Sequence, residues 1–476
     1  MNEQNILLAD ALRHNDAYDA GAVEALYREA LAKLSRKVVV FDDDPTGIQT
    51  THDVYVYTRW DVETLTEAFL DPYPMFYILT NSRALTAKET EVLHIEAAEN
   101  LIEASNRTGR PFTAMLRGDS TLRGHFPLET ETIKNVFTEH GIRVDGEILI
   151  PFFPEGGRYT FNDVHYLTQD GKTLIPVGNS EFARDWTFGY RSSNLPEWVE
   201  EKSNGRFPKE SVASVSIEEL SGLRIREIRE KLEGLTDFQK LIVNCTSYTD
   251  LKVFMTAFIE ALETGKNYLM RTASSATKVL GGVPDRPLLS KEELTGVNDT
   301  GVIVIGSHTK RTTDQLWRLK ERFPELEYIE FDVTGVLTPE RFRAAWQEVS
   351  DRLTDAVRKG KTSVIYTTRE DFTVDTGDPE DELRAAVTIS DAVTSFIEEL
   401  PVQPGFIIAK GGITSSGIGT KALHVRRALA LGQILPGVPV WQLGPESRFE
   451  GTSFIIFPGN VGTEDALADA VAILKQ

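Results

Sequence analysis

The sequence contains a single cysteine among 476 residues, which excludes an intrachain disulfide and favours a reducing compartment. We expect this residue, Cys245, to be a buried small apolar side chain rather than a nucleophile, because it ends an apolar run. The N-terminus lacks the basic and apolar stretches of a signal peptide, and no apolar run approaches the roughly 20 residues of a membrane span. We therefore expect a cytoplasmic protein with no membrane partner.

A surplus of positive charge is also missing. Lys and Arg number 51 against 72 Asp and Glu, which gives a formal net charge of −21. Nucleic-acid binding requires Lys and Arg to replace the counterions of the phosphate backbone, so this composition argues against a nucleic-acid partner. An anionic small molecule is not excluded, because a few local basic residues can bind one inside an acidic protein.

Several common catalytic motifs are absent from the sequence. It contains no Walker P-loop, no complete dinucleotide-binding fingerprint and no G-x-S-x-G turn. The eight histidines are scattered and form no H-E-x-x-H pattern, so a zinc site is not expected.

Short apolar runs alternate with helical patterns over most of the chain, which predicts α/β domains with mainly parallel sheets flanked by helices. The strand-like runs are residues 38–41, 54–57, 75–79, 112–116, 147–151, 241–245, 302–305, 327–331, 363–366, 405–409 and 453–457. The helical stretches are residues 89–105, 128–137, 251–263, 312–322, 339–359, 381–399, 420–430 and 466–474.

We expect two domains. The first covers residues 1–277 and begins with a helical arm, residues 1–36, which could pack on the sheet or form a contact in a homo-oligomer. Residues 155–210 break the alternation, and we interpret them as an insertion that carries loops and could form a lid. Residues 278–300 have the composition of a linker, and residues 301–476 form the second domain.

Three consecutive carboxylates, Asp42, Asp43 and Asp44, follow the first predicted strand and precede a Pro-Thr-Gly turn. In open α/β sheets, ligands bind at the carboxyl ends of the strands. Adjacent like charges repel, so we expect a cation or a hydroxyl donor to hold these carboxylates together. The alternative is an exposed acidic turn.

A second polar cluster follows the strand predicted at residues 112–116. Guanidinium groups can bind a carboxylate with two hydrogen bonds, and Asp, Ser and Thr can discriminate between hydroxyl groups. The cluster could therefore bind a sugar acid, although a polar surface turn is the alternative. Its candidate residues are Arg117, Asp119, Ser120, Thr121, Arg123 and Gly124, joined by Arg83 after another strand, and by His125 as either a base or a structural residue.

Three loops rich in small residues follow predicted strands of the second half. Glycine lets backbone amides approach a phosphate, and a following helix N-terminus favours negative charge. One such loop could be an ordinary tight turn, but three in one domain predict nucleotide binding. The candidate residues are Gly306, Ser307, Gly411, Gly412, Ile413, Thr414, Ser415, Gly459, Asn460 and Gly462.

Taken together and in this order, these motifs resemble the four-carbon acid sugar kinase family, which was long described as a domain of unknown function. The resemblance covers the chain from about Val38. The D-D-x-T-G pattern of the family stands at residues 43–47 and its D-S-T-x-R-G pattern at residues 119–124. The chain departs from the family at Ile413, where many members carry an acidic residue, and this puts one Mg²⁺ ligand in doubt.

The resemblance implies an N-terminal domain that binds the sugar acid, a C-terminal domain that binds ATP, and an active site in the cleft between them. Members phosphorylate threonate, erythronate or 3-oxo-tetronate. We expect Arg83, Arg117 or Arg123 to bind the substrate carboxylate, and Asp43 or Asp44 to orient the attacking hydroxyl and accept its proton. Mg²⁺ and the glycine-rich loops would stabilise the charge of the γ-phosphate.

Two other functions stay open at this point. Residues 42–46 also fit the D-x-D-x-T pattern of haloacid-dehalogenase-type phosphatases, with Asp42 as the nucleophile. The third candidate function is that of a protein that binds a sugar acid without catalysing a reaction.

Overall fold

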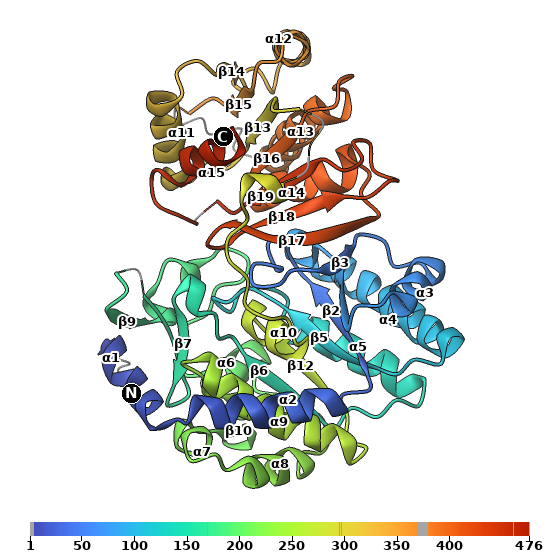
Figure 1. The fold of residues 1–476 in the computed structure, drawn as a ribbon, viewed down its shortest axis with the longest axis vertical. Coiled ribbons are helices and arrows are strands. Elements are labelled where there is room, and N and C mark those ends of the chain that lie inside the picture. The colour runs from blue at the N-terminus through green and yellow to red at the C-terminus, as the bar shows by residue number, and fades with distance from the viewer. Residues whose placement is uncertain are drawn as a thin grey trace. The chain divides into compact units, whose positions relative to one another are not determined.

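The computed structural model describes residues 4–168, 170–294, 296, 298–369, 379–459 and 461–475. The chain divides into two compact units (Figure 1). The first comprises Met1–Gly47 and Arg59–Asp285, and the second comprises Ile48–Thr58 and Arg286–Gln476. Both units are α/β, and their central strands are mostly parallel, which confirms the predicted fold class.

The first unit is built on a parallel sheet with the strand order β10-β11-β6-β12-β5-β2-β4. In that order the strands are Ala213–Val215, Gln239–Val243, Gly146–Ile150, Tyr268–Thr272, Phe112–Arg117, Lys37–Asp42 and Met75–Leu79. The inner strands are buried on both faces, as their continuous apolar runs require.

Helices cover both faces of this sheet (Figure 1). One layer contains α2 (Ala20–Lys33), α8 (Ile225–Glu233) and α9 (Tyr248–Glu263), with the shorter α7 (Ile217–Ser221) and α10 (Ser274–Leu280) beside it. The other contains α3 (Val62–Leu70), α4 (Ala87–Thr108) and α5 (Leu128–Glu139). Helix α9 is buried on nearly all sides, because α2 and α8 pack on it in addition to the sheet. Cys245 is fully buried beside this layer, as predicted.

The N-terminal arm packs on the first unit. It contains β1 (Ile6–Leu7), α1 (Leu8–Leu12) and α2. The buried carboxylate of Asp250 is 2.9 Å from the His14 ring nitrogen Nε2 and accepts a hydrogen bond of 2.5 Å from the Tyr18 hydroxyl. The sequence left two roles open for the arm, packing on the sheet and contact in a homo-oligomer. These contacts support the first.

The insertion at residues 155–210 has a sheet of its own, instead of consisting of loops. Strands β7 (Arg158–Phe161), β8 (Val164–Leu167) and β9 (Thr173–Pro176) are antiparallel, and β1 pairs with β9 at the edge. The turn between β7 and β8 has positive φ at Asn162 and Asp163, residues that tolerate this conformation in tight hairpins. Helix α6 (Leu195–Lys202) completes the insertion.

The sheet of the second unit has the order β3-β17-β18-β19-β16-β13-β15-β14. In that order the strands are Val54–Tyr57, Arg427–Leu435, Val438–Leu443, Ser453–Phe457, Phe406–Lys410, Gly301–Ile305, Ser363–Thr367 and Glu327–Phe331. The strands from β19 to β14 are parallel, and β3, β17 and β18 add an antiparallel part. Strand β3 comes from residues 48–58 and pairs with β17, so an early piece of sequence completes this unit.

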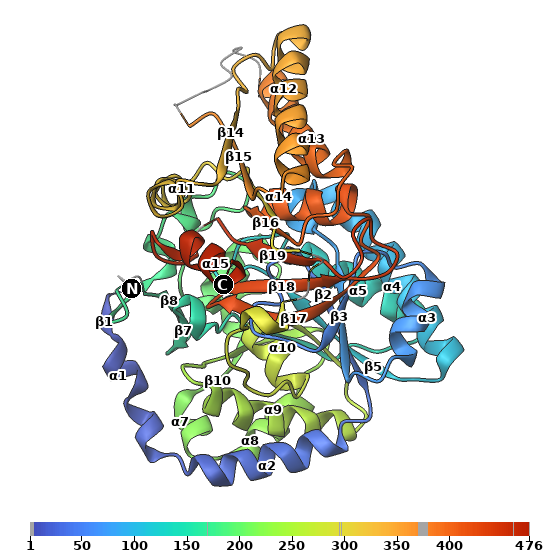
Figure 2. The same ribbon diagram turned by 45° about the horizontal axis from the view of Figure 1, so that its top comes forward.

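Figure 2 shows helices on both faces of this second sheet. Helices α11 (Lys310–Arg322) and α15 (Ala466–Leu474) lie on one face. Helices α12 (Pro339–Arg358), α13 (Pro379–Glu398) and α14 (Gly412–Gly417) lie on the other. Across the described ranges, no helix combines the length and apolar character needed to cross a bilayer.

One predicted element was wrong. The helix expected at residues 420–430 is only a short helical turn, Ile418–Ala422, and is followed by strand β17. The Ala and Leu residues of this segment favour a helix intrinsically, but the backbone of β17 pairs with β3 and β18, and alternate side chains of β17 are buried on one face of the sheet. Tertiary pairing therefore overrides local propensity here.

Candidate functional site

In the first unit, the predicted sugar-acid residues gather where the parallel strands end. The register pairs Asp42 at the end of β2 with Leu79 of β4 and with Arg117 of β5, and Arg117 with Thr272 of β12. Polar residues that are far apart in sequence therefore meet at one edge of the sheet. We call this edge the guanidinium cluster; it contains Asp42, Asp43, Asp44, Arg83, Arg117, Asp119, Arg123, Glu129 and Arg271.

Asp43 is held by two arginines. Arg83 donates to both carboxylate oxygens, at 3.0 Å from Nε to Oδ2 and 2.7 Å from Nη2 to Oδ1. Arg117 Nη1 adds a contact of 3.4 Å, and the Asp43 side chain is only 3% exposed. Burial raises the pKa of Asp43, and the two arginines oppose this shift. Such two-pronged ion pairing fixes the geometry of both partners.

The other two aspartates have opposite electrostatic environments. Burial raises the pKa of Asp42 to about 8 despite the attraction of Arg117 at 3.3 Å, so this carboxyl is protonated at pH 7. Burial also acts to raise the pKa of Asp44, but Arg83, Arg117 and hydrogen bonds from Thr46 lower it overall. Burial of a neutral Asp42 and the guanidinium groups that face Asp43 and Asp44 reduce the repulsion among the three adjacent carboxyls.

The loop after β5 is organised by Asp119. Arg123 Nε donates to Asp119 Oδ2 at 2.7 Å, the Thr121 hydroxyl donates to the same oxygen, and Arg83 Nη1 lies 3.9 Å from Oδ1. Burial would raise the pKa of Asp119, but Arg123 and Arg83 hold it far below its usual value. Ser120 is buried, and its carbonyl accepts a hydrogen bond of 2.8 Å from His165 Nε2.

Gly124 has φ +115°, which disfavours any residue with a side chain. A Cβ atom there would lie 3.0 Å from Arg271 Nη2 and 3.5 Å from Asp43 Oδ2. The glycine of the D-S-T-x-R-G pattern thus makes room for the guanidinium cluster. His125 does not face the cluster through Nε2, which donates to the Leu85 carbonyl at 2.9 Å, and this supports its structural reading.

Arg271 and Glu129 belong to the cluster but were missed from the sequence. Arg271 Nη1 donates to Glu129 Oε2 at 2.9 Å, and Nη2 donates to the Arg123 carbonyl at 3.1 Å. Burial would raise the pKa of Glu129, but Arg271 and a 2.6 Å hydrogen bond from Ser82 help to lower it to about 2. Arg271 directly follows the apolar residues of β12, and this position could have identified it. The sequence analysis did not predict this strand.

In the second unit, the three glycine-rich loops follow the parallel strands β13, β16 and β19 and lie side by side. The amides of Gly306 and Ser307 donate to the Lys410 carbonyl, and the amide of Gly411 donates to the Phe457 carbonyl. A Cβ atom at Gly306 would lie 2.2 Å from the Thr414 hydroxyl oxygen. We call this arrangement the loop cluster, and it brings together the loop residues expected to bind nucleotide.

The N-terminus of α11 holds the loop after β19. The Thr312 hydroxyl donates to Ser307 Oγ at 3.0 Å and to the Gly459 carbonyl at 3.2 Å. Arg311 donates to the Gly462 carbonyl at 2.6 Å. The remaining predicted residue of this loop, Asn460, lies outside the described residues.

The residues after Gly411 differ in exposure. Gly412 and Ile413 begin α14, and the Ile413 side chain is 69% exposed. Ser415 points inward, because its hydroxyl donates to the carbonyls of Ala409 and Gly411 at 2.9 and 2.8 Å. Ser415 therefore stabilises the loop from within.

Lys410 is a fully buried lysine that was not singled out from the sequence as a site residue. Its Nζ donates to the carbonyls of Pro458 and Gly459 at 2.6 and 3.3 Å and lies 4.1 Å from the centre of the Phe457 ring. Burial, assisted by the positive charge of Arg311, lowers the pKa of Lys410 to about 7. Lys410 thus connects two of the three loops at the base of the loop cluster.

The loop cluster does not fit a Mg²⁺ ion held by protein side chains. Residues 306–309, 411–416, 458–459 and 461–463 carry no carboxylate, the loop after β19 ends in Glu464 and Asp465 next to α15, and Ile413 stands where many family members carry an acid. Among the residues whose positions are described, no group of three or more His, Cys, Asp or Glu could hold a metal. We therefore assign no magnesium ligand.

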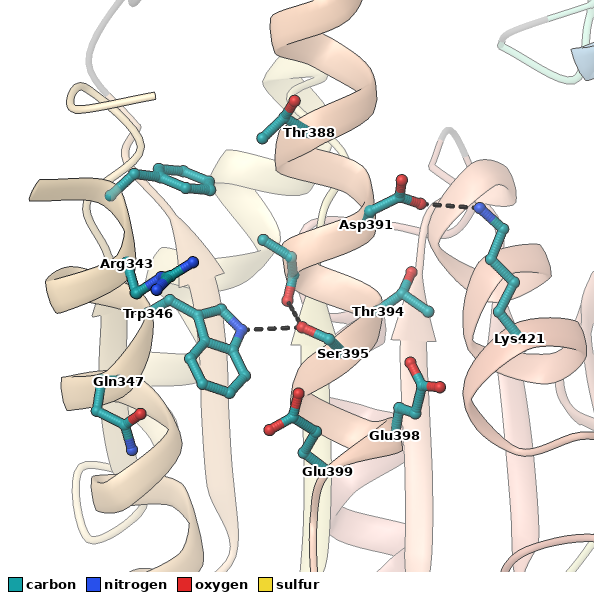
Figure 3. Close-up of a pocket in the computed structure, with 12 residues that line it drawn as sticks. Arg343, Trp346, Gln347, Thr388, Asp391, Thr394, Ser395, Glu398, Glu399 and Lys421 are labelled. Carbon is teal, nitrogen blue, oxygen red and sulfur yellow. Dashed lines mark hydrogen bonds and ion pairs between the residues drawn. The ribbon is translucent and has the colours of Figure 1, made fainter. Parts of the chain in front are cut away.

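A separate cavity of about 690 Å³ opens between α12 and α13 (Figure 3). Trp346 Nε1 donates to Ser395 Oγ at 2.9 Å, and Lys421 pairs with Asp391 at 2.8 Å. The lining has more carboxylates than cations, which disfavours a triphosphate. Its charged members are Arg343, Asp391, Glu398, Glu399 and Lys421. The loop cluster therefore remains the candidate for nucleotide binding.

Comparison with known families decides the assignment. Residues 38–280 match the family model for a sugar-binding N-terminal domain, and residues 302–467 match the model for a nucleotide-binding C-terminal domain. The first match alone covers more than half of the chain. The chain belongs to the four-carbon acid sugar kinase family. The resemblance seen in the sequence motifs is thus confirmed.

Solved structures with a similar fold cover nearly the whole chain. A Haemophilus influenzae protein of the same family, DUF1537, has 17% sequence identity and a TM-score of 0.59, with 92% of this chain and 100% of that chain covered. A Salmonella typhimurium LT2 protein with a provisional tRNA-synthase name has 14% identity and a TM-score of 0.62, with 91% and 98% covered. At these identities the likeness shows the fold alone. No curated protein matches the chain.

Proposed function

We propose that this protein transfers the γ-phosphoryl group of ATP to a hydroxyl of a four-carbon sugar acid of the threonate, erythronate or 3-oxo-tetronate type. The observation that supports this most strongly is that one chain carries a guanidinium cluster in its sugar-binding domain and a loop cluster in its nucleotide-binding domain. A sugar acid requires the first and a triphosphate requires the second.

Of the two candidate aspartates, we assign to Asp44 the role of orienting the attacking hydroxyl and accepting its proton. Its side chain is 18% exposed against 3% for Asp43, and its Oδ2 is 3.6 Å from Arg83 Nη2 whereas Asp43 binds Arg83 through both oxygens. Asp43 then positions Arg83 and Arg117. The remaining predicted substrate residues, Asp119, Ser120, Thr121, Arg123 and Gly124, form the adjacent wall.

The proposed reaction forms a bond between the substrate hydroxyl oxygen and the γ-phosphorus, and it breaks the bond from that phosphorus to the β–γ bridging oxygen. ADP leaves, and the hydroxyl proton passes to Asp44. A carboxylate with a lowered pKa is a weak base, but phosphoryl transfer has a loose transition state and depends mainly on positioning and electrostatics. The Ser307 hydroxyl and the amides of Gly412 and Gly459 would bind the phosphates. Mg²⁺ is expected as the counterion of ATP, and none of these assignments depends on a protein ligand to it.

The phosphatase alternative is disfavoured by the environment of Asp42. A nucleophilic aspartate must be ionised and accessible. The Asp42 side chain is 1% exposed, and burial raises its pKa to about 8.

The test is an assay of purified protein on a panel of four-carbon acids, with and without ATP. We expect ADP to form only when both ATP and one of the acids are present. Acid binding without ADP formation would favour the non-catalytic alternative. Release of phosphate from sugar phosphates without ATP would favour the phosphatase.

A further inference from the structure

The guanidinium groups of the cluster are already engaged within the protein. Each has a carboxylate partner on another element or within its own loop. These pairs are Arg83–Asp43 at 2.7 Å, Arg117–Asp43 at 3.4 Å, Arg123–Asp119 at 2.7 Å and Arg271–Glu129 at 2.9 Å. To bind a substrate carboxylate, any of them must share or give up an existing partner.

Arg158, the first residue of β7, differs from all of them. Within the described part of the chain, its side chain makes no ion pair and no hydrogen bond, and its buried Nε has no partner. Its backbone is anchored through reciprocal hydrogen bonds with Phe153 at 2.8 and 3.0 Å. A partly buried guanidinium without a counter-charge is costly, so its retention needs an explanation outside the fold.

The position of Arg158 supplies this explanation. The Phe182 ring lies near both Arg158 and Arg123, with its centre 5.6 Å and 5.1 Å from the two guanidinium carbons. Arg123 is bound to Asp119 in the sugar-acid loop. Burial lowers the pKa of Arg158, Asp119 raises it and Arg123 lowers it further, which is consistent with Arg158 lying beside that loop. The uncommitted cation therefore adjoins the guanidinium cluster.

We propose that Arg158 binds the carboxylate of the sugar acid, and that the insertion carrying it selects acids over neutral sugars. In this assignment, Arg83, Arg117 and Arg123 position Asp43 and Asp119 instead of gripping the carboxylate themselves. A guanidinium with its hydrogen-bond donors free matches a carboxylate with two parallel hydrogen bonds. The proposal rests on the proposed function for the identity of the acid.

The test compares Arg158→Gln and Arg158→Lys with the unmodified protein and with a matched control, Arg184→Gln. Arg184 is an exposed arginine of the same insertion. Binding of threonate and erythronate is measured by titration calorimetry without nucleotide, together with threitol and erythritol, in which a CH₂OH group replaces the carboxylate. Nucleotide binding is measured on the same preparations.

We expect Arg158→Gln to weaken binding of the acid about 10- to 150-fold, the range for losing hydrogen bonds to a charged group. Arg158→Lys should be intermediate, because lysine cannot make the two-pronged contact. Binding of the neutral alcohols and of nucleotide should not change, and Arg184→Gln should behave as the unmodified protein. The melting temperature of Arg158→Gln should stay level or rise, whereas loss of a structural arginine would lower it.

Unchanged binding of the acid by Arg158→Gln, or an equal loss for acid and alcohol, would overturn the assignment. If the unmodified protein binds none of the four-carbon acids, both this assignment and the proposed substrate class fail. If it binds them through Arg158 but forms no ADP, only the proposed phosphoryl transfer fails.

Discussion

At the scale of single residues, three neighbouring aspartates differ because each has different neighbours. Asp42 is buried and protonated, Asp43 is bound by two arginines, and Asp44 is ionised and partly open. Sequence reasoning singled out the triplet as a candidate site but could not divide the roles. The division depends on Arg83 and Arg117, which reach the triplet only through the pairing of β2 with β4 and β5.

The first prediction concerns Asp43 and Asp44. Asp44→Asn should lower kcat about 10²- to 10⁴-fold, the usual effect of removing a general base, with little change in ATP affinity. Asp43→Asn should abolish turnover and also raise the KM for the acid, because Arg83 and Arg117 lose their shared partner. Steady-state kinetics with either substrate varied would separate these effects. Asp355→Asn, at an exposed position on α12, is the control. Full turnover in Asp44→Asn would remove this residue from the assignment.

A second prediction follows from the protonated state of Asp42. Because its folded pKa of about 8 lies above the unfolded value of about 3.9, the native state binds a proton that the unfolded state releases between these two pH values. This contribution to stability is complete below pH 4 and is lost as the pH rises to 8. Asp42→Asn cannot titrate, so its stability relative to the unmodified protein should increase over that window by up to about 1.4 kcal/mol per pH unit.

Melting temperatures of both proteins from pH 5 to pH 9 would test this prediction. The difference between them should grow up to pH 8 and then level off. Asp42→Asn should also keep most of the kinase turnover, whereas a phosphatase using Asp42 would be inactivated. A difference that does not vary with pH would mean that Asp42 is ionised in the fold.

The sequence singled out candidate residues that follow an apolar strand and missed cluster residues that lie within a strand or on the insertion. Arg83, Arg117 and Asp119 could be found because each lies at or just past a strand end. Arg271 and Lys410 are strand residues whose partners lie on other elements, Glu129 and the Pro458 carbonyl. Such partners depend on which strands become neighbours, and an isolated sequence does not specify that.

At the scale of elements, apolar runs predicted several parallel strands with accurate limits. Strands β4 and β19 coincide with the predicted runs, because buried parallel strands are almost continuously apolar. Strands β17 and β18 were missed, since Ala and Leu in β17 favour a helix and Pro439 lies in β18. The sheet of the insertion was missed because its short strands depend on pairing with one another.

The prediction at this scale concerns the loop cluster. Gly411 has φ +121°, and a Cβ atom there would lie 3.2 Å from Ser307 Cβ in the neighbouring loop. Gly411→Ala should therefore weaken nucleotide binding at least about tenfold while leaving binding of the sugar acid intact, since backbone strain of this kind costs about 1–3 kcal/mol. Separate titrations with nucleotide and with the sugar acid, by calorimetry or fluorescence, would measure the two dissociation constants.

Gly451→Ala is the matched control for this substitution. Gly451 also has positive φ, +73°, but a Cβ atom there meets nothing within 4 Å. It should cost some stability without changing nucleotide affinity. Equal effects of the two substitutions would mean that the Gly411 loop does not contact the nucleotide.

At the scale of the whole molecule, positive charge is concentrated locally in a chain that is acidic as a whole. The chain carries a net charge of −21, yet its sugar-binding domain concentrates arginines at one edge of a sheet, and the loop cluster presents amides and hydroxyls. This arrangement suits two anionic small molecules. The family match, with its sugar-binding and nucleotide-binding domains, agrees with this distribution.

The most direct test of the account follows the phosphoryl group itself. The protein is incubated with ATP labelled in the γ-phosphate and with one four-carbon acid at a time, and the products are separated and identified by mass. We predict that the label appears covalently on the acid, in equal amount to the ADP formed, for at least one acid of the threonate, erythronate and 3-oxo-tetronate series. Label found only in inorganic phosphate, at a rate independent of every acid, would contradict the account.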